Sequence, residues 1–142
     1  MANPFLVLGG VVLGIVTAGF GIAQVPGWIA SAQDGAAQND IDQVKMSEAS
    51  SITQSGNALA SISALNTAGT GVTIQQSGGV KVGISVGTGA GASNYVVVTQ
   101  SASGKYFASI NGGAIGSGAS ITAAVTAAGT LPTGLTAPAS VS

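Results

Sequence analysis

A long apolar stretch opens the chain. Residues 5–25 read FLVLGGVVLGIVTAGFGIAQV, in which Thr17 and Gln24 are the only polar side chains, and no side chain before Asp34 ionises. About 20 consecutive apolar residues suit a helix that crosses a bilayer or packs inside an assembly. The pattern therefore predicts an apolar transmembrane or fibre-core helix over residues 1–33.

Small residues recur within this apolar segment, and they allow neighbouring helices to approach closely. Glycine and proline also weaken a helix, so partial unwinding is expected near Gly19, Gly21 and Pro26. Trp28 follows the proline at the place of an interfacial aromatic anchor. The residues expected to mediate membrane insertion and polymerisation are Phe5, Leu6, Val7, Leu8, Gly9, Gly10, Val11, Val12, Leu13, Gly14, Ile15, Val16, Phe20, Ile22, Val25 and Pro26.

A one-sided apolar pattern follows over residues 34–66. Near-helical spacing relates its apolar positions, which predicts an amphipathic helix that ends near Asn66, where the turn residues NTAGTG begin. The apolar stripe expected to pack on the rest of the protein consists of Ile41, Val44, Ile52, Leu59, Ile62 and Leu65.

Residues 70–142 predict a β-rich head with a low-complexity C-terminal tail. One hairpin is expected between residues 71–77 and 80–86, across Gly78-Gly79, and a second between residues 94–100 and 105–110. Alternation of apolar and polar residues predicts one apolar and one solvated sheet face. The linker GTGAGAS is expected to be exposed, SITAAVTA to add a further strand, and the last dozen residues to form an extended tail.

The expected fold class is therefore α+β. A long N-terminal helix, apolar in its first half and amphipathic in its second, would pack on a small antiparallel four-stranded sheet. The apolar stripe of the amphipathic half is the available cover for the apolar face of that sheet.

Charge is scarce throughout the chain. Only 5% of the residues are charged and the formal net charge is −1, which leaves no basic surface for nucleic acid. A soluble monomer usually carries more surface charge. This composition favours a chain that packs against copies of itself or against lipid. The abundant Ser and Thr are compatible with an O-linked glycan.

Motifs for catalysis are weak. The chain has no His and no Cys, so it lacks the usual nucleophile–base pairs and Cys/His metal sites. Asp40 and Asp42 diverge on a helix, which disfavours a paired-carboxylate site. The pairs Asp42–Lys45 and Lys45–Glu48 fit a solvated helix face. We expect no enzymatic activity, no cofactor and no metal.

Two further binding motifs are also unconvincing. GTGAGAS lacks the lysine of a phosphate-binding loop and does not open an expected helix. Tyr95, Tyr106 and Phe107 could stack on bases, but they fall within the apolar hairpin pattern and are expected to pack in the core.

The N-terminal half resembles the bacterial type IV pilins and pseudopilins. Phe5 and Pro26 have the spacing of the initial Phe and the Pro in the pilin helix, and VVLGIV is similar to its apolar core. Ala32-Gln33-Asp34 and residues 36–40 are similar to the stretch that leads into the amphipathic half. The chain is atypical in having Gly9 where pilins carry a Glu.

The resemblance implies a structural subunit of an extracellular type IV pilus-like filament, or fimbrium. Such a subunit is inserted in the membrane before assembly and then forms a homopolymer at the cell surface, with roles such as adhesion. Two alternatives remain: a single-pass membrane-anchored surface or binding protein, and a viral coat or tube subunit built on the same plan. A cleaved signal peptide is disfavoured, because no basic residue precedes the apolar stretch.

Overall fold

The computed structural model describes the backbone from Pro4 to Ser142 and the side chains from Val25 onwards. The chain divides into two compact units, Met1–Ala32 and Gln33–Ser142, and the second unit is called the head below. The long helix α1 (Pro4–Ser55) contributes residues to both units.

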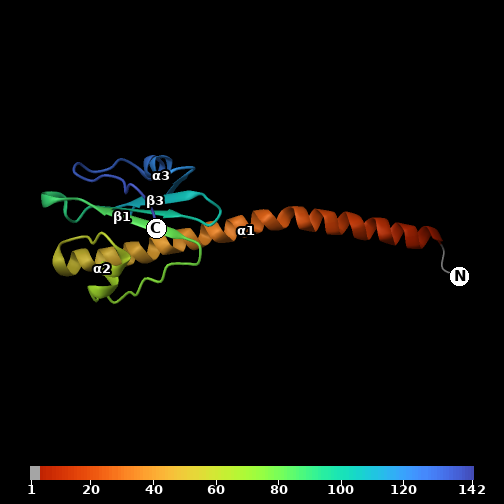
Figure 1. Ribbon diagram of the computed structural model, residues 1–142, viewed down its shortest axis with the longest axis horizontal. Helices are drawn as coiled ribbons and strands as arrows, with labels where there is room; N and C mark the ends of the chain where they lie inside the picture. Colours follow the sequence, from red (N-terminus) through yellow and green to blue (C-terminus); the bar gives the residue numbers. More distant parts are fainter. Residues whose placement is uncertain (1–3) are drawn as a thin grey trace. The chain divides into compact units, whose positions relative to one another are not determined.

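The head combines helices with one antiparallel sheet (Figure 1). After α1, its elements are α2 (Ile62–Thr67), β1 (Lys81–Val86), a 3₁₀ turn (Gly89–Gly91), β2 (Tyr95–Gln100), β3 (Tyr106–Ile110), β4 (Gly116–Gly118) and α3 (Ile121–Ala128). Among the described residues, the strands form a four-stranded sheet in the order β1-β2-β3-β4. The predicted α+β class, with a helix packed on a four-stranded antiparallel sheet, is confirmed.

The strands pair in a simple meander. β1 pairs with β2 in a register that places Val82 opposite Thr99, and β2 pairs with β3 with Val98 opposite Ala108. The predicted hairpin between residues 94–100 and 105–110 is therefore present. The segment that precedes β1, by contrast, does not belong to the sheet.

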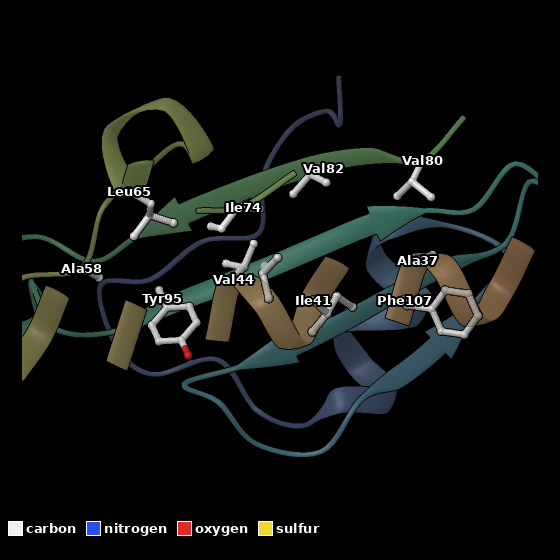
Figure 2. Packing of buried hydrophobic residues seen from close by; sticks show 11 residues of the cluster. Ala37, Ile41, Val44, Ala58, Leu65, Ile74, Val80, Val82, Tyr95 and Phe107 are labelled. Atoms are coloured by element: carbon white, nitrogen blue, oxygen red, sulfur yellow. The ribbon is translucent and has the colours of Figure 1, made fainter. Parts of the chain in front are cut away.

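The C-terminal part of α1 covers one face of the sheet. Ala37, Ile41 and Val44 of α1 are buried in one cluster with Tyr95 and Val97 of the central strand β2 (Figure 2). The hydroxyl of Thr99, on the same face, donates a hydrogen bond of 3.1 Å to the carbonyl oxygen of Ala37. This face is the apolar face that the sequence predicts.

The opposite face of the sheet is also covered, which corrects the prediction of a solvated face. Val96 and Val98 of β2 are fully buried in a second cluster with Val125 of α3 and Leu135 of the C-terminal segment. A strand that is covered on both sides has a continuous apolar run rather than an alternating one. The run Val96-Val97-Val98 has that character.

The predicted first hairpin is wrong. Residues 71–77 are not a strand, because their backbone groups bond to side chains instead of a ladder. The amide of Asn66 donates to the Ile74 carbonyl at 3.0 Å and accepts from the Ile74 N–H at 2.8 Å. β1 pairs instead with β2, across a loop closed by the Gly87 N–H and the Asn94 carbonyl.

The predicted helix to Asn66 is also interrupted. α1 ends at Ser55, where Gly56 adopts a φ of 76° and donates its N–H to the Ile52 carbonyl at 2.8 Å. A glycine in this left-handed conformation is a common helix terminator. The chain restarts as α2, capped by the Ser61 hydroxyl.

The C-terminal region is more ordered than the sequence predicts. The expected strand SITAAVTA is helix α3, which begins with Ser120 as an N-cap that accepts from the Ala123 N–H at 3.2 Å. The expected extended tail packs on the head: Leu135 is buried, and Ser142 exchanges two backbone hydrogen bonds with Val82. Serine caps favour helix initiation in a stretch rich in alanine.

Glycine permits the close contact of α3 with β4. A Cβ atom on Gly116 would lie 2.6 Å from the Ala124 carbonyl oxygen, and one on Gly118 would lie 2.6 Å from the Ala123 Cβ. Real Cβ contacts are almost never that short, so the two backbones can approach only because these positions carry no side chain. Gly83 of β1 is a further position of this kind, because a Cβ atom there would lie 2.6 Å from the Ser140 carbonyl oxygen.

Candidate functional site: the apolar surface and polar contacts of α1

Most of the predicted polymerisation helix lies outside the residues whose side chains the structure describes. The backbone of α1 is helical from Pro4. The predicted residues that lie outside the described side chains are Phe5, Leu6, Val7, Leu8, Gly9, Gly10, Val11, Val12, Leu13, Gly14, Ile15, Val16, Phe20 and Ile22. Of the predicted set, Val25 and Pro26 are described. The helix continues through Gly19, Gly21 and Pro26, so the expected unwinding does not occur.

Exposed apolar side chains follow directly on this segment. Val25, Trp28 and Ile29 have exposed fractions of 43%, 69% and 52%. Their spacing of three and four residues places them on neighbouring positions of one helical surface. Val25 belongs to the predicted set and Trp28 is the expected aromatic anchor, whereas the sequence reasoning missed Ile29.

Among the residues whose side chains the structure describes, no helix has an apolar stretch long enough to cross a membrane. The predicted membrane segment, residues 5–25, lies outside this part of the chain except for Val25.

The predicted head-packing stripe lies in one place although it comes from separate elements. Ile41, Val44 and Leu65 are fully buried, and Ile52, Leu59 and Ile62 are partly buried against the same cluster. Because α1 ends at Ser55, Leu59 reaches the cluster from the connecting turn, and Ile62 and Leu65 reach it from α2. Figure 2 shows Leu65 and Val44 on the same side of the sheet as Ile41.

The acidic residues of the head do not share one solvated surface. Asp42 is exposed and pairs with Lys45 at 3.2 Å, as the sequence predicts. Asp40 is fully buried and accepts hydrogen bonds from the Ser77 N–H at 2.8 Å and the Ser77 hydroxyl at 2.6 Å. A carboxylate that accepts a backbone N–H in this way fixes a loop, here the segment before β1.

Glu48 departs most from the prediction, since it is fully buried rather than paired with Lys45 on a solvated face. Its Oε2 accepts the Leu59 N–H at 3.0 Å, and burial raises the pKa of this carboxyl to about 7. Burial, together with the charge of Glu48, raises the pKa of Tyr95 to about 12. The sequence held a signal: Glu48 falls in the apolar stripe, four residues after Val44 and four before Ile52.

A cavity of about 310 Å³ opens beside the edge of β1. Ser61 and Ile62 of α2 line one side of it, and Val82, Ile84 and Ser142 line the other. None of the side chains that line it is ionisable.

The described residues contain no cluster of three or more His, Cys, Asp or Glu that could hold a metal ion. Lys105 lies over the Phe107 ring, with 5.3 Å from Nζ to the ring centroid. The motif GTGAGAS forms the loop and 3₁₀ turn between β1 and β2, without a following α-helix. Tyr95 and Phe107 are buried in the core, while Tyr106 packs partly buried on the opposite face.

Comparison with protein-family models, with curated proteins and with solved structures finds no match to this chain. The class of protein is therefore defined by the fold alone: an α+β head that shares its first helix with an apolar N-terminal segment.

Proposed function

We propose that this chain is a structural subunit of an extracellular type IV pilus-like filament and that it polymerises through its N-terminal helix. The observation that supports this most is the exposed apolar surface of Val25, Trp28 and Ile29 on α1. These three residues belong to a segment of 33 residues without an ionisable side chain. A helix of this character needs lipid or other helices around it.

Copies of the same helix would satisfy this exposed apolar surface outside a membrane. Burying one large apolar side chain contributes up to about 1.5–3 kcal/mol relative to leaving it in water. Trp28 and Ile29 are more than half exposed, so each retains much of that free energy for an interface. In a helical polymer the same contact repeats at every subunit, which multiplies a modest gain.

The head offers little competing apolar surface. Both faces of its sheet are covered. Among the described residues of the head, Met46 is the one large apolar side chain that is exposed. A head of this kind suits the outer layer of a filament, while the helices supply the cohesion. Before assembly the apolar segment would reside in the membrane, and the assembled filament would stand at the cell surface, where adhesion is one role it could serve.

The test is electron microscopy of the chain in its native assembly, combined with substitution of Gly9, Gly10 and Gly14 by Leu. Leucine at these positions enlarges the surface that neighbouring helices would share. We expect filaments from the unaltered chain and few or none from the triple variant. Gly35→Leu is the matched control, since a Cβ atom there meets nothing within 4 Å.

A chain that stays monomeric in detergent and forms no filament under any condition would contradict the proposal. If the triple variant remains membrane-bound and keeps a binding activity of the head, the chain is an anchored surface protein. If closed particles or tubes form instead, it is a coat subunit.

A further inference from the structure

One buried carboxyl joins α1 to the segment that follows it. Glu48 lies on α1, its side chain is fully buried, and its Oε2 accepts the Leu59 N–H at 3.0 Å. Its other oxygen, Oε1, is buried and has no hydrogen-bond partner among the described residues. A buried ionised carboxylate with a single donor is costly, whereas the neutral acid is far less so.

The surroundings of Glu48 provide no compensating positive charge. The chain from Gly56 to Thr67, which includes α2, has no ionisable side chain. Lys45, one turn before Glu48 on α1, bonds to Asp42 at 3.2 Å. On the sheet, the Tyr95 phenol interacts electrostatically with Glu48, and its charged form would repel the carboxylate.

We propose that Glu48 is a pH-operated latch: in its neutral form it holds the segment Gly56–Thr67 against α1, and on ionisation it releases that segment. The remaining polar ties of this region do not titrate. Ser51 bonds to the Asn57 carbonyl at 3.0 Å, and Ser47 bonds to Thr70 at 2.7 Å. Release would expose Leu65, which is fully buried when the segment is docked.

The direction of the pH dependence follows from the pKa. Burial raises the pKa of Glu48 from 4.5 to about 7, so the docked state holds a proton that the open state gives up. Docking is therefore strongest below about pH 4.5, weakens as the pH rises towards 7, and is constant above that value. Ionisation of Glu48 alone can lower the protection of the docked segment against hydrogen exchange by up to about 300-fold. The difference between the two pKa values sets this factor.

The experiment is residue-resolved hydrogen exchange of the full 142-residue chain in detergent, between pH 4.5 and pH 8.5, corrected for the intrinsic exchange rate. We expect the protection of the Leu59 N–H to fall at least tenfold between pH 5 and pH 8. The carbon chemical shift of the Glu48 carboxyl, followed in the same samples, should titrate near pH 7. The Val98 N–H, in the central strand, should show no such fall.

Glu48→Gln and Glu48→Leu remove the ionisation and should abolish the pH dependence of Leu59 protection. Asp42→Asn removes an exposed carboxyl on the same helix and should leave it unchanged. The latch is refuted if Leu59 protection in the unaltered chain does not vary with pH. It is equally refuted if the Glu48→Leu variant keeps the variation, or if the Glu48 carboxyl titrates near pH 4.5.

Discussion

The carboxylate of Asp40, on α1, accepts two hydrogen bonds from Ser77, one from its N–H at 2.8 Å and one from its hydroxyl at 2.6 Å. The contact joins residues that are 37 positions apart and is the point at which the irregular segment before β1 is fixed to the helix. One of the few charged residues of the head is therefore buried and has a structural role.

Removing the Asp40 carboxylate should destabilise the head. In Asp40→Ala the N–H and hydroxyl of the half-buried Ser77 lose their acceptor, which typically costs about 1.5–3 kcal/mol for a bond to a charged group. Denaturant unfolding measures this loss. Asp42→Ala removes an exposed ion pair and should change the free energy of unfolding by less than about 0.5 kcal/mol. Equal effects of the two substitutions would contradict a structural role for Asp40.

Gly116 should tolerate no side chain. Gly116→Ala places a Cβ atom 2.6 Å from the Ala124 carbonyl oxygen and forces α3 away from β4. Overpacking of this kind costs about 1–3 kcal/mol or more, and thermal unfolding should show a melting temperature lower by several degrees. Gly78→Ala meets nothing within 4 Å and serves as the control, with an unchanged melting temperature. A stable Gly116→Ala protein would mean that α3 packs elsewhere.

The exposed apolar surface of α1 should be needed for assembly but not for folding. Trp28→Ser and Ile29→Ser remove side chains that are 69% and 52% exposed, so the stability of the head should be unchanged while the filament yield falls. Electron microscopy and sedimentation measure that yield. Met46→Ser removes an equally exposed apolar side chain from the head and should leave assembly intact. Loss of filaments in Met46→Ser alone would place the interface on the head.

The ionisation of Tyr95 should depend on Glu48. Burial and the Glu48 charge raise the pKa of Tyr95 to about 12, so its phenol stays neutral until strongly alkaline pH. In a Tyr106→Phe background, Tyr95 is the remaining tyrosine, and absorbance at alkaline pH reports it alone. Adding Glu48→Gln removes the charge contribution and should lower the Tyr95 pKa. An unchanged midpoint would show that burial acts by itself.

Local sequence signals determined several elements. Two apolar runs, YVVVTQ and KYFASI, flank the short connection SASG and predict a hairpin. The structure contains that hairpin as β2 and β3. The spacing of Ile41 and Val44 indicated which surface of α1 faces the sheet, because helical periodicity alone fixes which side chains share a face. The α+β class followed from these two patterns.

Tertiary contacts decided what the sequence could not. Residues 71–77 alternate like a strand but lie outside the sheet, because Asn66 and Asp40 bond to their backbone groups. SITAAVTA forms a helix because Gly116 and Gly118 leave room for it on β4, where it buries Val125 against the sheet. The spacing of Glu48 within the apolar stripe agrees with its burial, but the Leu59 N–H that it binds comes from the segment after α1, which the sequence did not place there. Periodicity reports which residues share a face, but the partner that covers the face comes from distant parts of the chain.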